Sequence, residues 1–418
     1  MREMKDSGLE WVGKIPSEWV SHPVYYYFGE RKNKNIFGQE NNLLSLSYGR
    51  VIRKDINTNG GLLPESFNTY NIVEAGDIII RPTDLQNDKK SLRTGLCRER
   101  GIITSAYIAL RPIKKLNSGF FRYLLHAYDI SKVFYNMGNG VRQGLNFSEF
   151  SQLMVFEPPR EIQDRIADFL DTKCTEIDAL TADIQTQIDT LEQYKRSVIT
   201  ETVTKGLNPD AEMKDSGIQW IGNMPSHWEV IRGKYILRYM QKPVREDDGV
   251  ITCFRDGEVT LRSNRREDGF TMSDKEIGYQ GIDIGDLVVH GMDGFAGSIG
   301  ISDSRGKASP VLNVLDTDQN KRYIMYYLRS MAYSDVFLAL ATGIRVRSCD
   351  LRWNKLADLS YPVPPLDEQK AIVEHIDAVL AKADAVISDK KAQLATLDDY
   401  KKSLIFEYVT GKKEVPVS

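Results

Sequence analysis

Met4–Trp19 reads MKDSGLEWVGKIPSEW, and Met213–Trp228 reads MKDSGIQWIGNMPSHW. Ten of the sixteen positions are identical, and the second stretch begins 209 residues after the first. A repeat of this length is too long for a solenoid, whose units are a few tens of residues. We therefore expect one globular-plus-helix unit to occur twice, so that the chain presents two similar surfaces to a pseudo-symmetric partner.

A second pair of matching segments closes each half of the chain. Pro158-Pro159 and Pro364-Pro365 each open a long run of mixed polar and apolar residues, 206 residues apart. The residues that stay in register within these runs are Gln163/Gln369, Asp171/Asp377, Asp178/Asp384, Tyr194/Tyr400 and Lys195/Lys401. Each run is predicted to form one long helix. The first, Glu161–Thr204, would be roughly 65 Å long at about 1.5 Å per residue.

Apolar residues along both predicted helices recur with heptad spacing, which is typical of a coiled coil. The residues expected to pair the helices are Ile177, Leu180, Ile184, Leu191, Tyr194 and Val198 in the first, and Val386, Leu397, Tyr400 and Leu404 in the second. If a two-fold axis perpendicular to the helices relates the halves, the pair is antiparallel and holds the globular parts apart. The alternative is that each helix packs on its own globular part.

The globular halves combine short strands with amphipathic helices, which predicts an α+β fold with mixed α/β domains and internal pseudo-two-fold symmetry. Matched strands are expected at Gly76–Ile80 and Gly285–Val289 and at Ser105–Leu110 and Ser309–Leu315, with helices near Phe120–Phe134 and Lys321–Leu340. The predicted domains are 1–157 and 211–363, each followed by a helical spacer, 158–210 and 364–418.

Composition describes a soluble globular protein of 418 residues, with 41% apolar and 27% charged residues. No apolar run approaches the roughly 20 residues of a membrane span, and the first residues lack the apolar core of a secretory signal. The four cysteines are scattered, without a CxxC pair, so a disulfide framework is not expected and a reducing cytoplasm fits.

Charge is unevenly distributed along the chain, although the net charge is only −3. Residues 20–157 hold 18 Lys and Arg against 12 Asp and Glu, whereas residues 158–212 hold 6 against 12. The acidic helices would repel phosphate, so a polyanion is expected to meet the globular parts. On charge alone, an uneven solvated surface explains the same pattern.

No recognisable catalytic motif is present in the sequence. Gly300–Ala308 resembles a phosphate loop, but its spacing is wrong and Ala308 stands where Ser or Thr would bind magnesium. The glycine-rich Gly291–Gly300 lacks dinucleotide-binding spacing and is interpreted as a mobile loop. The five histidines form no metal-ligand spacing. A duplicated chain without these features is more consistent with a reader or scaffold than with an enzyme.

The loops of both halves contain the residue types with which proteins read DNA. Arg binds guanine bidentately, Asn and Gln bind adenine, and Lys fixes register on phosphate. The candidate DNA-binding residues are Lys32, Lys34, Arg50, Arg53, Lys54, Arg81, Lys89, Lys90, Arg93, Arg142 and Gln143 in the first half, and Arg255, Arg262, Arg265, Arg266, His290, Arg345 and Arg347 in the second. Trp11, Trp19, Trp220 and Trp228 lie in the best-matched repeat, where sequence-reading residues should differ, so packing on a helix end or docking of a shared partner is the preferred interpretation.

The duplicated order of three motifs resembles the specificity subunits of type I restriction–modification systems, over nearly the whole chain. The motifs are the repeated opening at Gly8–Trp19 and Gly217–Trp228, the helix start Pro364–Gln369 (PPLDEQ), and the helix ends Tyr194–Ile199 and Tyr400–Ile405. The first helix start departs from the pattern because Ile162 stands where the second has Glu368. One contact at that helix start is therefore left open.

This resemblance implies two target-recognition domains that each read half of a split double-stranded DNA target, with the antiparallel helices setting the unread spacer. It implies docking of two DNA adenine methyltransferase subunits and association with restriction (translocase) subunits, in the cytoplasm and without a membrane. It also implies that the chain itself holds no cofactor, because S-adenosylmethionine, ATP and magnesium belong to those partners. Two rival hypotheses are a scaffold without a DNA role and a solitary DNA-modifying enzyme, which the missing methyl-donor motif disfavours.

Overall fold

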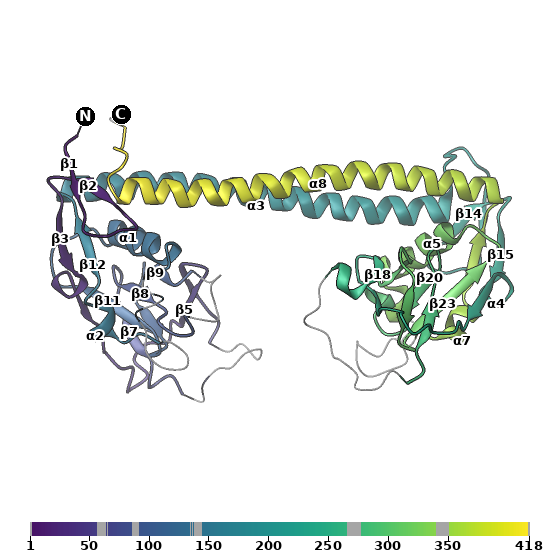
Figure 1. The fold of residues 1–418 in the computed structure, drawn as a ribbon, viewed down its shortest axis with the longest axis horizontal. Helices are drawn as coiled ribbons and strands as arrows, with labels where there is room; N and C mark the ends of the chain where they lie inside the picture. Colours follow the sequence, from purple (N-terminus) through teal and green to yellow (C-terminus); the bar gives the residue numbers. More distant parts are fainter. Residues whose placement is uncertain are drawn as a thin grey trace. The chain divides into compact units, whose positions relative to one another are not determined.

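The structure, a computed structural model, describes residues 2–56, 64, 66–85, 92–133, 135, 137, 144–265, 277–339 and 351–416. The chain forms two compact units (Figure 1). Unit 1 comprises Met1–Ile184 and Ala392–Ser418, and unit 2 comprises Gln185–Lys391. The long helices α3 (Arg160–Lys205) and α8 (Leu366–Val409) each contribute to both units. The division between the units therefore cuts through each helix.

Unit 1 is an antiparallel sheet with a helix on one face and a hairpin on the other. Its strands are β1 (Met4–Asp6), β2 (Lys14–Pro16), β3 (Val20–Pro23), β4 (Phe28–Glu30), β5 (Leu44–Ser47), β6 (Arg50–Arg53), β7 (Asn71–Val73), β8 (Ile78–Ile80), β9 (Thr94–Leu96), β10 (Gly101–Ile103), β11 (Ile108–Pro112) and β12 (Met154–Glu157). Besides the long helices it contains η1 (Val24–Tyr26), α1 (Ser118–Ile130) and α2 (Phe147–Phe150). Four strands pair antiparallel in the order β4-β11-β8-β9.

The central strand β8 is buried on both faces because successive side chains point to opposite sides. Ile78 and Ile80 pack into the main core with α1, whereas Ile79 packs into a separate cluster with the β5 residues Leu44 and Leu46. The run of three isoleucines thus joins a helix layer to a hairpin layer.

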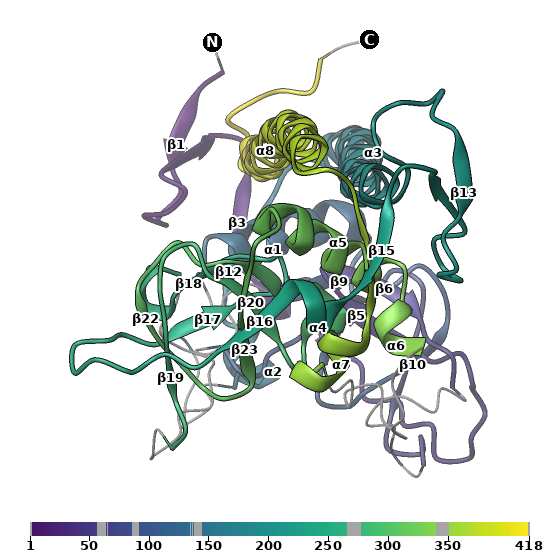
Figure 2. The ribbon, with the colours of Figure 1, turned by 90° about the vertical axis from the view of Figure 1, so that its right-hand side faces the viewer.

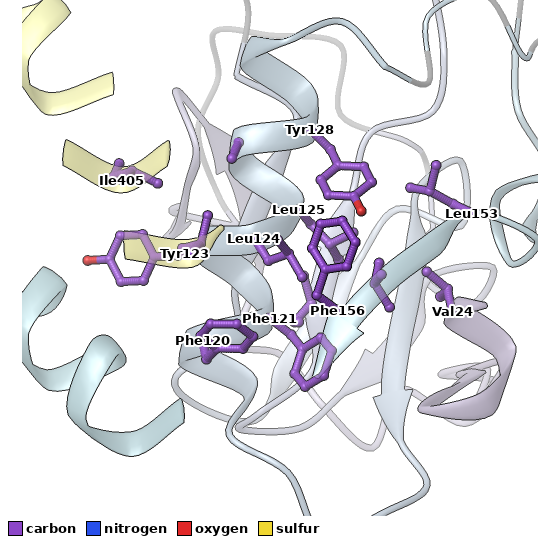
Figure 3. Packing of buried hydrophobic residues seen from close by; sticks show 14 of the residues in the cluster. Val24, Phe120, Phe121, Tyr123, Leu124, Leu125, Tyr128, Leu153, Phe156 and Ile405 are labelled. Atoms are coloured by element: carbon purple, nitrogen blue, oxygen red, sulfur yellow. The ribbon is translucent and has the colours of Figure 1, made fainter. Parts of the chain in front are cut away.

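Helix α1 begins at an N-cap, since the Asn117 side chain accepts a hydrogen bond from the Phe120 backbone N–H. Its buried face, which includes Phe121 and Tyr128, packs against Val24, Leu153 and Phe156 (Figure 3). Ile405 of α8 belongs to the same core. The C-terminal half of α8 is therefore part of the first globular unit.

Unit 2 contains the same strand order in its main sheet, β16-β23-β20-β21, also antiparallel. Its strands are β13 (Met213–Asp215), β14 (Asn223–Pro225), β15 (Glu229–Arg232), β16 (Leu237–Met240), β17 (Ile251–Cys253), β18 (Val259–Leu261), β19 (Gln280–Ile282), β20 (Leu287–His290), β21 (Ile299–Ile301), β22 (Gly306–Ala308), β23 (Leu312–Thr317) and β24 (Ser360–Val363). Its shorter helices are α4 (Gly233–Ile236), η2 (Arg262–Asn264), η3 (Gly294–Ala296), α5 (Lys321–Tyr333), α6 (Val336–Ala339) and α7 (Trp353–Asp358).

Helix α5 lies between the sheet of unit 2 and the long helices (Figure 2). The Asn320 side chain caps its first turn, as Asn117 caps α1. The opposite face of the sheet carries the β17–β18 hairpin, which packs so closely that a Cβ on Gly300 would lie 1.9 Å from the Gly257 carbonyl oxygen. Glycine is required there because any side chain would collide with backbone.

Within each unit the long helices run antiparallel, since early residues of one contact late residues of the other. In unit 1, Lys401 Nζ donates to Asp178 Oδ1 over 2.6 Å. In unit 2, Lys195 Nζ donates to Asp384 Oδ1 over 2.5 Å, and Lys390 donates to Gln187. Lys195/Lys401 and Asp178/Asp384 are two of the pairs in sequence register, so the repeat specifies matching lysine–aspartate contacts in the two units.

Other register pairs tie the long helices to the globular parts. Gln163 accepts a hydrogen bond from the Asn117 backbone N–H, and Gln369 accepts one from Asn320, each over 2.9 Å. Asp171 accepts from the hydroxyl and guanidinium of Tyr123 and Arg122. Asp377 accepts in the same way from the side chains of Tyr326 and Arg322. The repeated polar residues thus mark the junction between each globular part and the helices.

Of the residues predicted to pair the helices, every seventh one is buried or half-buried. The predicted residues that lie between these are exposed. Ile177, Ile184 and Leu404 are buried, and Leu191, Val198 and Leu397 are half-buried. Leu180, Tyr194, Val386 and Tyr400 are instead 44–53% exposed and lie off the seam. The residues that follow them, Thr181, Lys195, Ile387 and Lys401, are more buried and take their place. This correction shifts the spacing from three-then-four to four-then-three residues.

Trp19 and Trp228 are fully buried at the ends of the long helices, which confirms packing over base stacking. A Cβ on Gly206, just after α3, would lie 3.2 Å from Trp228, and one on Gly411, just after α8, would lie 3.0 Å from Trp19. Both glycines have positive φ, +73° and +70°, a backbone conformation that favours glycine at a helix C-terminus.

The two tryptophan sites differ in one hydrogen bond, at the position that departs from the repeat. The indole N–H of Trp228 donates to Glu368 Oε1 over 3.1 Å, and His227 Nε2 lies 2.7 Å from the other carboxylate oxygen. Ile162 occupies the position of Glu368 in the first copy, and the buried Nε1 of Trp19 has no hydrogen-bond partner among the described residues. The departure at residue 162 therefore removes a real contact.

The predicted strands and helices are present in the structure, although the predicted helix ends Phe134 and Leu340 lie outside the described residues. The strands expected near residues 80, 289, 110 and 315 are β8, β20, β11 and β23, and the long helices are α3 and α8. The predicted helix near Phe120–Phe134 is α1, and the one at Lys321–Leu340 is divided into α5 and α6. Among the described residues, no helix has the length and apolar character needed to span a membrane.

Candidate nucleic-acid interface

In unit 1, five of the candidate residues lie on exposed loops and on one hairpin. Lys32 is exposed and pairs with Glu30, and Lys34 donates to the Thr69 carbonyl oxygen over 2.9 Å. The β5–β6 hairpin carries Arg50 and Arg53 on β6, and the exposed Lys54 follows it. An exposed surface of this kind is available to a polyanion.

The hairpin arginines are already paired with carboxylates. Arg53 pairs with Glu99, and Arg50 pairs with Asp178 of α3, which Lys401 also contacts. Asp178, Arg50 and Lys401 line an open hollow of about 660 Å³ between the hairpin and the helices of unit 1. Arg50 therefore connects the β5–β6 hairpin to α3 in this structure.

The hairpin tip presents an aromatic residue that the sequence analysis missed. Tyr48 is 83% exposed and has a φ of +45°, and Gly49 follows with a φ of +75°. Two consecutive residues with positive φ are typical of the tight turn that joins two antiparallel strands. The signal in the sequence was Tyr-Gly between two alternating runs, although Asn-Gly or Asp-Gly is the commoner form.

Arg81 and Arg93 are brought together at the end of β8. The Arg81 backbone N–H donates to the Arg93 carbonyl oxygen over 2.9 Å. Arg93 is completely buried, and its guanidinium donates to Tyr135 Oη and to the carbonyl oxygens of Thr83 and Asp84. The assignment of Arg93 as a DNA-binding residue is therefore corrected: its side chain holds the segment after Arg81 and does not reach the surface.

Seven further candidates lie outside the described residues. They are Lys89, Lys90, Arg142, Gln143, Arg266, Arg345 and Arg347.

In unit 2 the four described candidates converge on one place. Arg255, Arg262, Arg265 and His290 line a single open hollow of about 850 Å³, although they come from three separate segments of sequence. Its floor includes Ile251 and Cys253 of β17 and Leu312 of β23. The sheet and the β17–β18 hairpin create this convergence.

Most guanidiniums around this hollow are bound to acidic neighbours. Arg255 pairs with Asp293 over 2.9 Å, and Arg265 pairs with Asp256 over 2.6 Å and with Glu258 over 3.1 Å. Arg262 Nε donates to Thr252 Oγ1 over 3.4 Å. The carboxylates of Asp256 and Asp293 are therefore already engaged by arginines of the hollow.

The glycine-rich segment Gly291–Gly300 forms part of the rim of this hollow. It connects β20 to β21 through η3, and Gly297 has a φ of +96°. A Cβ on Gly297 would lie 2.7 Å from the Arg255 carbonyl oxygen, so the segment passes close to the β17 end. This segment, interpreted from its sequence as a mobile loop, contains the short helix η3, and glycine at position 297 permits the close backbone approach.

Comparison with known proteins identifies relatives over most of this length. No family model matches the sequence. The chain is 26% identical over 325 residues to the putative type I restriction enzyme MjaX specificity subunit of Methanocaldococcus jannaschii, covering 74% of this chain and 71% of the relative. It is 23% identical over 337 residues to the type I restriction enzyme MjaVIII specificity subunit of the same organism, covering 76% and 75%.

A solved structure has the same fold over nearly the whole chain. It comes from work on complex assembly and conformational transition of the type I R-M system. The match has a TM-score of 0.67 at 13% sequence identity and covers 96% of this chain and all of that chain. The resemblance drawn from the repeated motifs is thereby confirmed: this chain is a homologue of type I restriction enzyme specificity subunits and has a fold found in type I restriction–modification systems.

Proposed function

We propose that this chain is the sequence-reading subunit of a type I restriction–modification complex and that each globular part reads one half of a split DNA target. The observation that carries the proposal is a contrast within the repeat. The two units share their sheet order, capped helix and helix-junction contacts. The basic loops around those sheets differ, as two readers of different half-sites require.

The long helices are proposed to set the number of unread base pairs between the two half-sites. Their support is the four-then-three seam, which is typical of a coiled coil, and the matching lysine–aspartate contacts. Removal of one heptad shortens a helix by about 10 Å, roughly three base pairs of DNA at 3.4 Å each. A matched deletion in α3 and α8 should therefore change the spacer and leave both half-sites unchanged.

The off-seam apolar residues are proposed to dock the methyltransferase subunits. Unit 1 exposes Leu180 and Tyr400, and unit 2 exposes Val386 and Tyr194. One tyrosine and one aliphatic residue per unit, at corresponding positions of the repeat, suit two copies of the same partner. The methyl donor, ATP and magnesium would be bound by the partner subunits, and this chain would contribute no catalytic group.

The decisive experiment is to co-express the chain with its adenine methyltransferase and to map methylated adenines in the host DNA. The expected result is a split motif with a fixed spacer that disappears when this chain is omitted. Exchange of residues 20–157 for another recognition domain should change one half of that motif. A stable complex that adds no methylation, together with no salt-dependent DNA binding, would instead identify a scaffold.

A further inference from the structure

The hollow of unit 2 is lined by a histidine, His290, whose hydrogen bonds determine which ring nitrogen carries the proton. His290 ends β20, and its Nδ1 accepts hydrogen bonds from the backbone N–H groups of Met292 and Asp293 over 3.2 and 3.0 Å. Because Nδ1 is an acceptor, the ring proton must be on Nε2. Burial lowers the pKa of His290, which keeps the ring neutral at physiological pH. The ring therefore offers a neutral N–H donor to the hollow that it lines.

A second polar side chain that lines the hollow, that of Ser298, lacks a hydrogen-bond partner among the described residues. Ser298 is 1% exposed. The His290 backbone N–H donates to the Ser298 carbonyl oxygen over 3.0 Å, so the two residues are neighbours across β20 and β21. An unpaired buried hydroxyl is costly, so this one is expected to bond a water or a ligand in the hollow.

The chemistry of the hollow favours a ligand with hydrogen-bond acceptors. The arginines that line it are donors, and the carboxylates of Asp256 and Asp293 are already paired with Arg265 and Arg255. In the major groove of DNA, guanine presents two adjacent acceptors, N7 and O6, whereas adenine has a donor beside its N7 acceptor and cytosine presents a donor. A hollow rich in N–H donors therefore favours guanine over adenine. Phosphate oxygens are acceptors too, so base and backbone must be distinguished by experiment.

The repeat indicates that this position differs between the two units. Arg81 directly follows β8, and His290 is the last residue of β20. The Arg81 backbone N–H donates to the Arg93 carbonyl oxygen just before β9, and the His290 backbone N–H donates to the Ser298 carbonyl oxygen just before β21. The two residues stand 209 apart, the offset of the repeated opening. Arg81 and His290 thus occupy the same position of the repeated framework but have different side chains. Such a difference is expected if the two globular parts read different half-sites.

We propose that His290 is a base-reading residue of the second globular part and that its Nε2–H donates to N7 of a guanine whose major-groove edge enters this hollow. This inference rests on the proposed function and deepens it, since it names the residue, the donor atom and the base acceptor.

The test removes the acceptor on the DNA side of the proposed bond and the donor on the protein side. Once the methylated motif is known, the complex with the methyltransferase is bound to duplexes in which each guanine of the half-site is replaced in turn by 7-deazaguanine, which lacks the N7 acceptor. At one position the unaltered complex should lose about tenfold in affinity, equivalent to about 1.4 kcal/mol. The His290→Asn variant should show no loss there.

Asparagine is chosen because its side-chain oxygen can still accept from the Met292 and Asp293 amides, while its NH2 group ends one bond short of the Nε2 position. Lys234→Ala is the matched control, since Lys234 is exposed on α4 and does not line the hollow. This control should respond to 7-deazaguanine as the unaltered chain does.

Two results would overturn the inference. One is an unaltered complex that tolerates 7-deazaguanine at every guanine of both half-sites. The other is a His290→Asn complex that binds all sequences more weakly by the same factor and with a smaller salt dependence, which is the behaviour of a phosphate contact. Failure of the proposed function is distinguishable from both, because it would leave no split motif to test.

Discussion

Glu368 connects the start of α8 to the buried tryptophan of unit 2, and its replacement is the most informative test of the repeat. Glu368→Ile reproduces the residue found at position 162 in the first copy. It removes a hydrogen bond from Trp228 to a charged acceptor, a class of bond that contributes about 1.5–3 kcal/mol. The Glu368 side chain is 26% exposed, so the lower part of this range applies, and we expect unit 2 to lose about 2 kcal/mol.

Three control variants test whether the loss of stability comes from the missing hydrogen-bond acceptor, from the removed negative charge or from the change in side-chain volume. Glu368→Gln retains an oxygen that can accept from the indole N–H, so its cost should stay below about 1 kcal/mol. The reverse change, Ile162→Glu, supplies Trp19 with its missing acceptor. The new bond and the lost isoleucine burial are similar in size, so we expect a change within about 0.5 kcal/mol. Ile231→Glu, at another half-buried site, should cost more because no unpaired donor is known there.

Hydrogen exchange measured by mass spectrometry is the appropriate assay, because the two units need not unfold together. Glu368→Ile should lower protection in peptides that cover β14, β15 and the start of α8, and should leave β1 and β2 unchanged. Equal losses for Glu368→Ile and Glu368→Gln would refute the hydrogen-bond argument. So would a cost of about 2 kcal/mol for Ile162→Glu.

Three further predictions concern stability. His126 is buried, and burial lowers its pKa to about 3. As the pH falls below about 6.5, His126 therefore binds a proton in the unfolded chain but not in the folded one, and the free energy of unfolding should drop by about 2 kcal/mol between pH 7 and pH 5. Denaturation curves of His126→Gln should lack this drop. Arg93→Met should destabilise unit 1 by about 3 kcal/mol, because carbonyl oxygens and Tyr135 lose their donor; a neutral result in thermal unfolding would contradict the role assigned to Arg93. Leu180→Lys should change the unfolding free energy by less than about 0.5 kcal/mol, whereas Ile184→Lys should cost about 3 kcal/mol or more; similar values for both would restore the predicted seam.

The repeat made the framework predictable from the sequence. Matched residues such as Gln163 and Gln369 proved to be junction contacts, since a duplicated chain needs the same polar bond twice. The departure at Ile162 was also visible in advance, and its consequence, an unpaired Trp19, follows from the loss of a carboxylate.

The seam was harder to predict because two heptad phases share every seventh residue. Leu180 and Tyr194 are more apolar than Thr181 and Lys195, so the pattern favoured them. In the structure Lys195 is 19% exposed, since its aliphatic stem lies in the seam while its ammonium reaches Asp384. Polar residues with long stems can therefore displace apolar ones from a helix interface.

The site was the least predictable part. A list of basic residues does not say which converge, and Arg255, Arg265 and His290 meet only because β17, η2 and β20 are adjacent in the folded unit. Arg93 was misassigned because a buried arginine and an exposed one look alike in sequence.

The participation of α8 in unit 1 has a consequence for the order in which the protein is made. Leu404, Ile405, Tyr408 and Val409 belong to the core of a unit that begins at the N-terminus. At about 5–20 residues per second, a ribosome adds the intervening chain in roughly 10–50 s. During that interval unit 2, which is continuous in sequence, can complete its core while the earlier unit waits with apolar surface uncovered. A nascent chain stalled before residue 392 would therefore be vulnerable to proteolysis in its first half and protected in its second.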